Sequence, residues 1–156
     1  MKQKIIFSLI TISSALFADG LDIEKLKAMK ARAIGPGGMS GRVTAIDVVL
    51  SNTDIMYVGT ASGGLWKSES GGVKWEPIFD NQKAACIGDV AVDPTNSDVI
   101  WVGTGEGNPR NSQSAGFGVY KSLDGGKTWE YKGLGETRNI HRVLINPHNA
   151  DIVYIG

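Results

Sequence analysis

Short apolar segments recur along the chain, and polar turns separate them. Residues 42–60 align without a gap with residues 86–104, and residues 139–156 form a third copy. Each copy holds two strand-length segments joined by an Asn/Asp turn, and the second segment carries an aligned aromatic residue: Tyr57, Trp101 or Tyr154. Apolar segments of this length, bounded by turn residues, are typical of β-strands.

A turn motif, Ser-x-x-Gly-Gly-x-x-Trp, follows the first two copies at residues 68–75 and 122–129. The paired glycines predict a tight hairpin. Asp124 can accept hydrogen bonds from the amides of its own turn, and Trp129 can fold over the hairpin as an apolar lid. Ser70 replaces the aspartate in the first turn. We therefore assign a structural role to Ser68, Gly71, Trp75, Ser122, Asp124, Gly126 and Trp129.

Each complete unit contains four predicted strands, which in the second unit are residues 87–92, 99–104, 118–122 and 128–132. Four strands at a period in the forties predict the blade of a β-propeller. We expect an all-β fold with four-stranded antiparallel blades at about 41–80, 85–133 and 139–156.

The third copy stops after its second strand, which gives about two and a half blades. A closed ring needs at least four blades. We therefore expect the sequence to be the N-terminal part of a longer protein, with an incomplete propeller domain over residues 41–156.

The first 18 residues predict a secretory signal peptide. Met1 to Lys4 is basic, Ile5 to Phe17 is apolar, and small residues precede two cleavage points. An uncleaved N-terminal anchor is the alternative. We expect a secreted, periplasmic or cell-surface protein with no membrane span in the mature chain. Residues 19–40 form a lead-in, and the spacing of apolar residues allows a short helix at 21–32.

Charge and metal-ligand spacing narrow the classes of partner. The chain has 16 basic and 16 acidic residues, and without its first 18 residues it has 14 and 16, a net charge of −2. This balance argues against a nucleic-acid partner. The two histidines lack metal-ligand spacing, so we predict no metal and no cofactor. Residues 93–98 and 146–151 hold several oxygen ligands, but they predict Asn/Asp turns rather than calcium loops.

Cys86 is the only cysteine, which excludes an intrachain disulfide. Its apolar flanks predict a buried, inert thiol.

Four longer motifs carry a family resemblance: residues 35–43 (Gly-Pro-Gly-Gly-Met-Ser-Gly-Arg-Val), 57–68, 103–112 and 119–129. Through them, residues 33–156 resemble large secreted bacterial BNR-repeat proteins, the glycosyl-hydrolase-like or sortilin-type β-propellers. The resemblance implies that the two Ser-x-x-Gly-Gly turns are Asp boxes, which are structural in that family. It leaves the activity open, because the superfamily includes sialidases, xyloglucanases, sorting receptors and photosystem assembly factors.

The resemblance also allows one test of glycosidase chemistry, which needs two carboxylates. Xyloglucanases of similar repeat pattern carry an aspartate directly after the second strand of the first blade, where this chain has Ala61. That catalytic assignment therefore fails at this residue. Arg42 resembles the first arginine of the sialidase cluster, but the proline that usually follows is absent.

The longest polar insertion, residues 105–118, follows the second strand of the second unit. Long polar loops on a rigid scaffold are where binding sites collect. We predict that ligands contact Arg42, Glu106, Asn108, Arg110 and Asn111, with Glu106 as the best acid candidate. The alternative is that Glu106 pairs with Arg110 and braces the loop.

We predict a secreted, glycosyl-hydrolase-like β-propeller module that binds a glycan or protein ligand at its central loop face. The alternative is a glycoside hydrolase, sialidase-like or xyloglucanase-like, whose catalytic residues lie largely beyond residue 156. Whether the chain is part of an enzyme stays open at this point.

Overall fold

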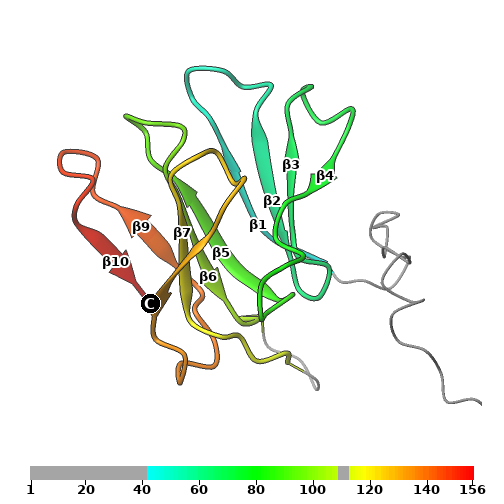
Figure 1. The fold of residues 1–156 in the computed structure, drawn as a ribbon, viewed down its shortest axis with the longest axis vertical. Helices are drawn as coiled ribbons and strands as arrows, with labels where there is room; N and C mark the ends of the chain where they lie inside the picture. The colour runs from blue at the N-terminus through cyan, green and yellow to red at the C-terminus, as the bar shows by residue number, and fades with distance from the viewer. Residues whose placement is uncertain (1–41, 109–112) are drawn as a thin grey trace, which may run out of the picture. The chain divides into compact units, whose positions relative to one another are not determined.

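The computed structural model describes residues 42–108 and 113–156 (Figure 1). The predicted signal peptide, the lead-in of residues 19–40 with its helix, and the predicted ligand residues Arg110 and Asn111 lie outside the described residues. The chain divides into two compact units, and all described residues belong to the second, Ala33–Gly156.

The described residues form ten strands and no helix, and every strand pairing is antiparallel. The first sheet has the order β1-β2-β3-β4, the second β5-β6-β7-β8, and the third pairs β9 with β10. This confirms the predicted all-β fold of four-stranded blades with two strands of a third. The strands are β1 Val43–Val48, β2 Met56–Thr60, β3 Leu65–Ser68, β4 Glu76–Pro77, β5 Ile87–Val92, β6 Ile100–Thr104, β7 Val119–Ser122, β8 Glu130–Gly133, β9 Val143–Ile145 and β10 Val153–Ile155.

Strand boundaries in the second blade differ from the prediction by one or two residues at three strands. β7 begins after Gly118 because that residue has a φ of 72°, which a regular strand does not adopt. β8 begins at Glu130 because the amide of Thr128 donates to Asp124 Oδ1 at 2.8 Å and stays in the turn. Local turn geometry therefore sets where these strands begin.

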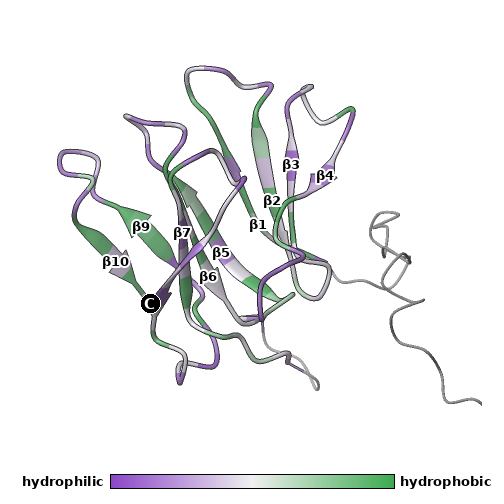
Figure 2. Ribbon diagram, in the orientation of Figure 1, coloured by the Kyte–Doolittle hydropathy of each residue, from purple (hydrophilic) through white to green (hydrophobic). Residues whose placement is uncertain are grey.

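Apolar side chains fill the space between the first two blades. Most of β9 and parts of β2 and β5 are hydrophobic in Figure 2, whereas the turns at the upper ends of the strands are mostly polar. Fully burying one large apolar side chain contributes about 1.5–3 kcal/mol. The side chains of this cluster with the least exposure are Tyr57, Leu65, Phe79, Ile87, Ile100, Val102 and Tyr120. A second cluster, Ala91, Val119, Ile140 and Val143, joins the second blade to the third.

Two aligned glycines make close blade packing possible. A Cβ on Gly59 would lie 2.6 Å from Ile87 Cγ2, and a Cβ on Gly103 would overlap Ile140 Cγ2 in the same way. Both glycines occupy the same position in the second strand of their blade. The repeated glycine therefore admits the isoleucine of the next blade.

Carboxylates on the first strands of the blades connect one blade to the next. Asp47 Oδ2 accepts the amide of Val92 at 2.7 Å, and Asp89 Oδ2 accepts the amide of Val143 at 2.8 Å. Their other oxygens accept the amide of the residue that follows each aspartate. Because β1, β5 and β9 lie at sheet edges, these carboxylates satisfy edge amides that the sheet ladders leave unpaired.

The Gly-Gly turn of the second blade is held by its own side chains. Asp124 Oδ1 accepts hydrogen bonds from Ser122 Oγ and from the amide of Thr128, both at 2.8 Å. These bonds, led by those from Thr128, lower the pKa of Asp124 to about 2. In the first blade Ser70 Oγ accepts the corresponding amide, that of Lys74, at 2.8 Å. A hydroxyl thus takes over part of the role of the carboxylate.

The two turn tryptophans find different acceptors. Trp75 Nε1 donates to Gly72 O of its own turn at 2.9 Å. Trp129 Nε1 donates instead to Ile78 O of the first blade at 2.8 Å, and its ring packs against Phe79. Trp129 therefore also joins the two blades, which the expectation of a lid over its own hairpin did not include.

Replacing Gly103 with alanine should destabilise the protein by about 1–3 kcal/mol, because the new methyl group overpacks the contact with Ile140. Urea unfolding of the full chain measures the loss. Combining Gly103→Ala with Ile140→Ala should cost less than the sum of the two single changes, since the second removes the clashing atom. Strictly additive losses would show that this contact does not set the packing.

Replacing Asp124 with alanine should lower the free energy of unfolding by about 1 kcal/mol near neutral pH. The pKa of Asp124 lies at about 2, below its usual value of 3.8, so this stabilisation is complete above about pH 4 and is lost as the pH falls toward 2. Urea titrations of wild type and variant at both pH values measure the effect. Asp124→Ser, which copies the first turn, is the matched control and should lose less. An undiminished difference at low pH would exclude a role for the charge.

Candidate functional site

The loop face is the end of the blades where the connections β2–β3, β4–β5, β6–β7 and β8–β9 lie (Figure 1). The Asn/Asp turns and the Gly-Gly hairpins lie at the opposite end (Figure 1). Backbone bonds join neighbouring connections: Gly64 N donates to Ala85 O at 2.8 Å and Ile140 N donates to Thr104 O at 3.1 Å. The loop face therefore has a continuous, hydrogen-bonded base.

The β6–β7 connection, residues 105–118, is fixed to the end of β6 by Thr104. The hydroxyl of Thr104 accepts the amide of Phe117 and donates to Gly118 O, both at 2.7 Å. Gly116 lies so close to the Thr104 backbone that no Cβ would fit there. The two ends of the insertion are thus rigid, as a binding loop on a scaffold requires.

Cys86 lies beneath this connection and is buried, as its apolar flanks predicted. Its thiol donates to Ala115 O at 2.9 Å, and burial raises its pKa. Because the thiolate is the reactive form, Cys86 serves packing rather than chemistry at this site.

The structure brings two predicted ligand residues together as an ion pair. Arg42 stands directly before β1 and Glu106 two residues after β6, and their side chains are in contact. Glu106 is 2% exposed, while about a third of the Arg42 side chain reaches solvent. Within the described residues Glu106 therefore pairs with Arg42, which the sequence analysis had not paired with it. The alternative partner that the sequence suggested, Arg110, lies outside these residues. A buried paired carboxylate is poorly placed to act as an acid or nucleophile.

Asn108 and Ala61, two further positions that the sequence analysis singled out, differ in their exposure to solvent. Asn108 is exposed, and its backbone carbonyl accepts a bond from Gln113 Nε2 at 3.0 Å. Ala61 is buried, and its amide donates to Arg42 O at 3.0 Å. The position at which the family resemblance implies a carboxylate is thus apolar and closed. Asp80, which the sequence analysis missed, is exposed beside Gly64 at the same end.

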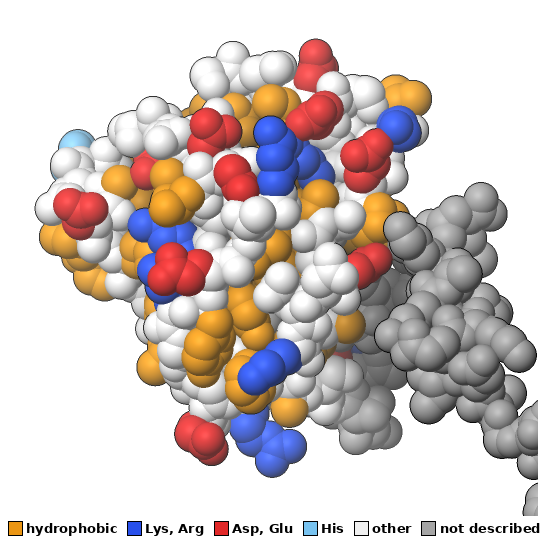
Figure 3. Space-filling model, in the orientation of Figure 1, with side chains coloured by type: hydrophobic (Ala, Val, Ile, Leu, Met, Phe, Trp, Pro, Cys, Tyr) orange, Lys and Arg blue, Asp and Glu red, His pale blue; other side chains and the backbone are white. Residues whose placement is uncertain are grey.

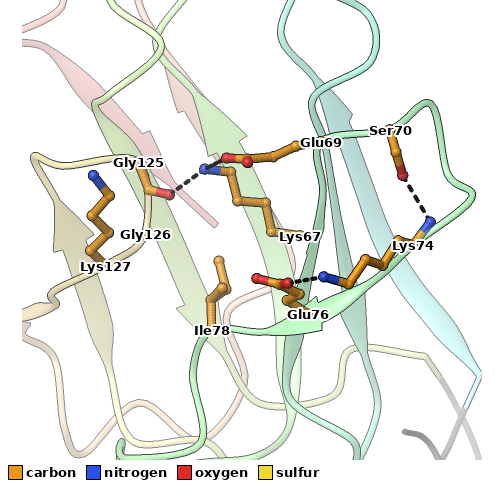
Figure 4. A pocket seen from close by; sticks show the side chains of 9 residues that line it. All are labelled: Lys67, Glu69, Ser70, Lys74, Glu76, Ile78, Gly125, Gly126 and Lys127. Atoms are coloured by element: carbon orange, nitrogen blue, oxygen red, sulfur yellow. Dashed lines mark hydrogen bonds and ion pairs between the residues drawn. The ribbon is translucent and has the colours of Figure 1, made fainter.

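One cavity lies elsewhere, at the seam between the hairpin turns of the first two blades (Figure 4). It has a volume of about 430 Å³. Four of its five charged side chains form ion pairs, Lys67 with Glu69 and Lys74 with Glu76, each at 2.7 Å, and the fifth is Lys127. Lys67 Nζ also donates to Gly125 O at 3.1 Å. These contacts make the cavity a seam between two blades rather than a ligand site.

Metal-ligating groups do not gather in the described part of the chain, where no three His, Cys, Asp or Glu side chains lie in position to share an ion.

Among residues 42–108 and 113–156, no helix has the length and apolar character to cross a membrane. Asp47 and Asp89, the acids that the sequence analysis overlooked, use both oxygens on backbone amides.

Replacing Arg42 with alanine should destabilise the full chain by about 3 kcal/mol, because it leaves the buried Glu106 carboxylate unpaired. Denaturant unfolding measures this loss. The double variant Arg42→Met/Glu106→Leu should recover most of it, since neither charge remains. An equal loss in both variants would show that the pair does not brace the loop.

Comparison with known proteins identifies solved structures that have a similar fold. No protein-family model matches the sequence, and no curated protein matches it. Among solved structures, an ancestral GH74 enzyme superposes with a TM-score of 0.60 and 26% identity, over 78% of this chain and 17% of that one. The GH74 enzyme of Niastella koreensis gives 0.53 and 24%, over 68% and 16%.

The GH74 xyloglucanase of Xanthomonas campestris gives a TM-score of 0.47 and 17% identity, over 66% of this chain and 16% of that one. The chain thus spans about a sixth of the length of these solved structures. The similarity to the first two establishes that its fold is a glycoside-hydrolase-like β-propeller.

Proposed function

We propose that this chain is part of a secreted β-propeller that binds a carbohydrate at the loop face and does not cleave it with the described residues. The observation that carries the proposal is the state of Glu106, which is buried and paired with Arg42. A glycosidase acid must reach the glycosidic oxygen, and a carboxylate enclosed in this way cannot.

In its described part, residues 105–108 and 113–118, the β6–β7 connection presents uncharged polar groups to solvent. Asn108, Gln113 and Ser114 are exposed, and together they offer amide and hydroxyl groups. Such groups donate and accept hydrogen bonds as sugar hydroxyls do. The glycoside-hydrolase-like fold supports a carbohydrate ligand over a protein ligand. Secretion rests on the signal-like residues 1–18 alone.

A glycoside hydrolase is the second candidate, because the similar solved structures are GH74 enzymes. In that case neither Ala61, which is apolar, nor Glu106, which is paired, would supply a catalytic carboxylate. Hydrolysis measurements on the full-length protein distinguish the two candidates.

The full-length protein should bind oligosaccharides such as cellohexaose or xyloglucan fragments without releasing reducing ends. Asn108→Ala should weaken binding by up to about tenfold, the effect of losing one hydrogen bond. Isothermal calorimetry and a reducing-sugar assay measure the two properties. Ser51→Ala, an exposed polar residue at the opposite end of the blades, is the matched control.

Two outcomes would contradict the proposal. One is hydrolysis that disappears in Glu106→Gln, which would make Glu106 a catalytic acid and establish the enzyme. The other is the absence of binding to every oligosaccharide tested.

A further inference from the structure

Tyr131 on β8 is an exposed aromatic residue whose ring is nevertheless held in place. It is 45% exposed. Its ring centroid lies 5.5 Å from that of Phe117 and 5.5 Å from that of Tyr120, its register partner on β7. Gly135 passes so close to the Tyr131 hydroxyl that a Cβ there would lie 2.5 Å from it. Neighbours on several sides therefore fix the ring.

The support behind Tyr131 continues into the core between the blades. Tyr120 meets Phe79 edge to face at 5.1 Å, and Phe79 meets Trp129 in the same way at 5.1 Å. Lys83 Nζ lies 4.5 Å from the ring centroid of Phe117. On the molecular surface, hydrophobic side chains beside a basic one are visible at the lower end of the blades (Figure 3). Tyr131 is thus the outermost member of a packed aromatic series.

This ring also packs against the connection that carries proposed ligand residues. Phe117 belongs to the β6–β7 connection that presents Asn108 and Gln113. The Phe117 amide is fixed by Thr104 Oγ1, so the backing ring and the polar loop share one anchor. A ligand that contacts the loop therefore has a rigid aromatic surface within the same part of the blade.

The chemistry of such a surface fits a sugar ring. A pyranose presents C–H groups on its faces and hydroxyls around its rim, and tyrosine likewise has an apolar ring and a polar end. A side chain that is already fixed loses little conformational entropy on binding. We propose that Tyr131, backed by Phe117 and Tyr120, stacks against a pyranose ring of the bound glycan. This inference rests on the proposed carbohydrate-binding function and adds a specific contact to it.

The test uses the full-length protein and the oligosaccharide it binds best among cellohexaose, mannohexaose and a xyloglucan heptasaccharide. Tyr131→Leu should raise the dissociation constant about tenfold, as expected for the loss of one aromatic stacking contact. Tyr131→Phe, which keeps the ring, should bind as the wild type does. Calorimetry gives the constants, and circular dichroism checks the fold.

A second measurement does not depend on the stability of Tyr131→Leu. Ring proton signals of Tyr131, assigned by their loss in Tyr131→Phe, should shift when the oligosaccharide is added to wild type. Unchanged affinity in Tyr131→Leu or unshifted ring signals, with the oligosaccharide still bound, would overturn the stacking contact and leave the proposed function standing. Failure of the wild type to bind any of the three oligosaccharides would overturn both.

Discussion

The packing of one blade against the next is the interaction on which the rest of this structure depends. A four-stranded sheet has two faces and two edges, and it cannot bury both faces alone. Gly59 and Gly103 let Ile87 and Ile140 of the following blade approach the sheet. The carboxylates of Asp47 and Asp89 then satisfy edge amides across the same boundary. Apolar contact and edge pairing thus act together at each repeat.

The carboxyl groups of Asp89 and Asp124 have pKa values that are shifted in opposite directions. Burial raises the pKa of Asp89 at the boundary between the second and third blades, although amide hydrogen bonds from Val143 and Val90 oppose the shift. Hydrogen bonds from the turn lower the pKa of Asp124 at the far end. As the pH rises from about 4, Asp89 contributes less to stability, whereas the contribution of Asp124 is already complete. Two structural aspartates therefore respond to acid in opposite directions.

The base of the loop face depends on one ion pair between the first two blades. The ion pair between Arg42 and Glu106 joins the start of the first blade to the insertion of the second. That contact stabilises the loop base and withdraws the carboxylate from solvent. The described residues of the β6–β7 connection then present uncharged polar groups, among them Asn108, and the fixed ring of Tyr131 lies exposed on β8. These groups are the basis of the carbohydrate binding that we propose.

Much of the fold followed from the sequence because its signals are local. The alternation of apolar segments and turns predicted the strands, and the 87–92 strand was placed without error. The hydrogen bonds of Asp124 lie within four residues of it, so turn chemistry alone was enough. The contacts of the predicted ligand residues were harder to predict, because the sequence identified only the loop that carries most of them. Of these, Asn108 lies exposed at the loop face, and Arg42 with Glu106 forms a pair.

Only the tertiary structure decided which distant groups meet. The sequence determined the repeat, the blade and the turns. It gave no sign that Glu106 pairs with Arg42, that Trp129 donates to Ile78 O, or that Phe117 backs Tyr131. Each of these contacts joins different strands or blades, so its partner depends on how whole sheets pack. Local hydrogen bonding is determined by neighbours along the chain, whereas side-chain partners across blades are determined by the packed fold.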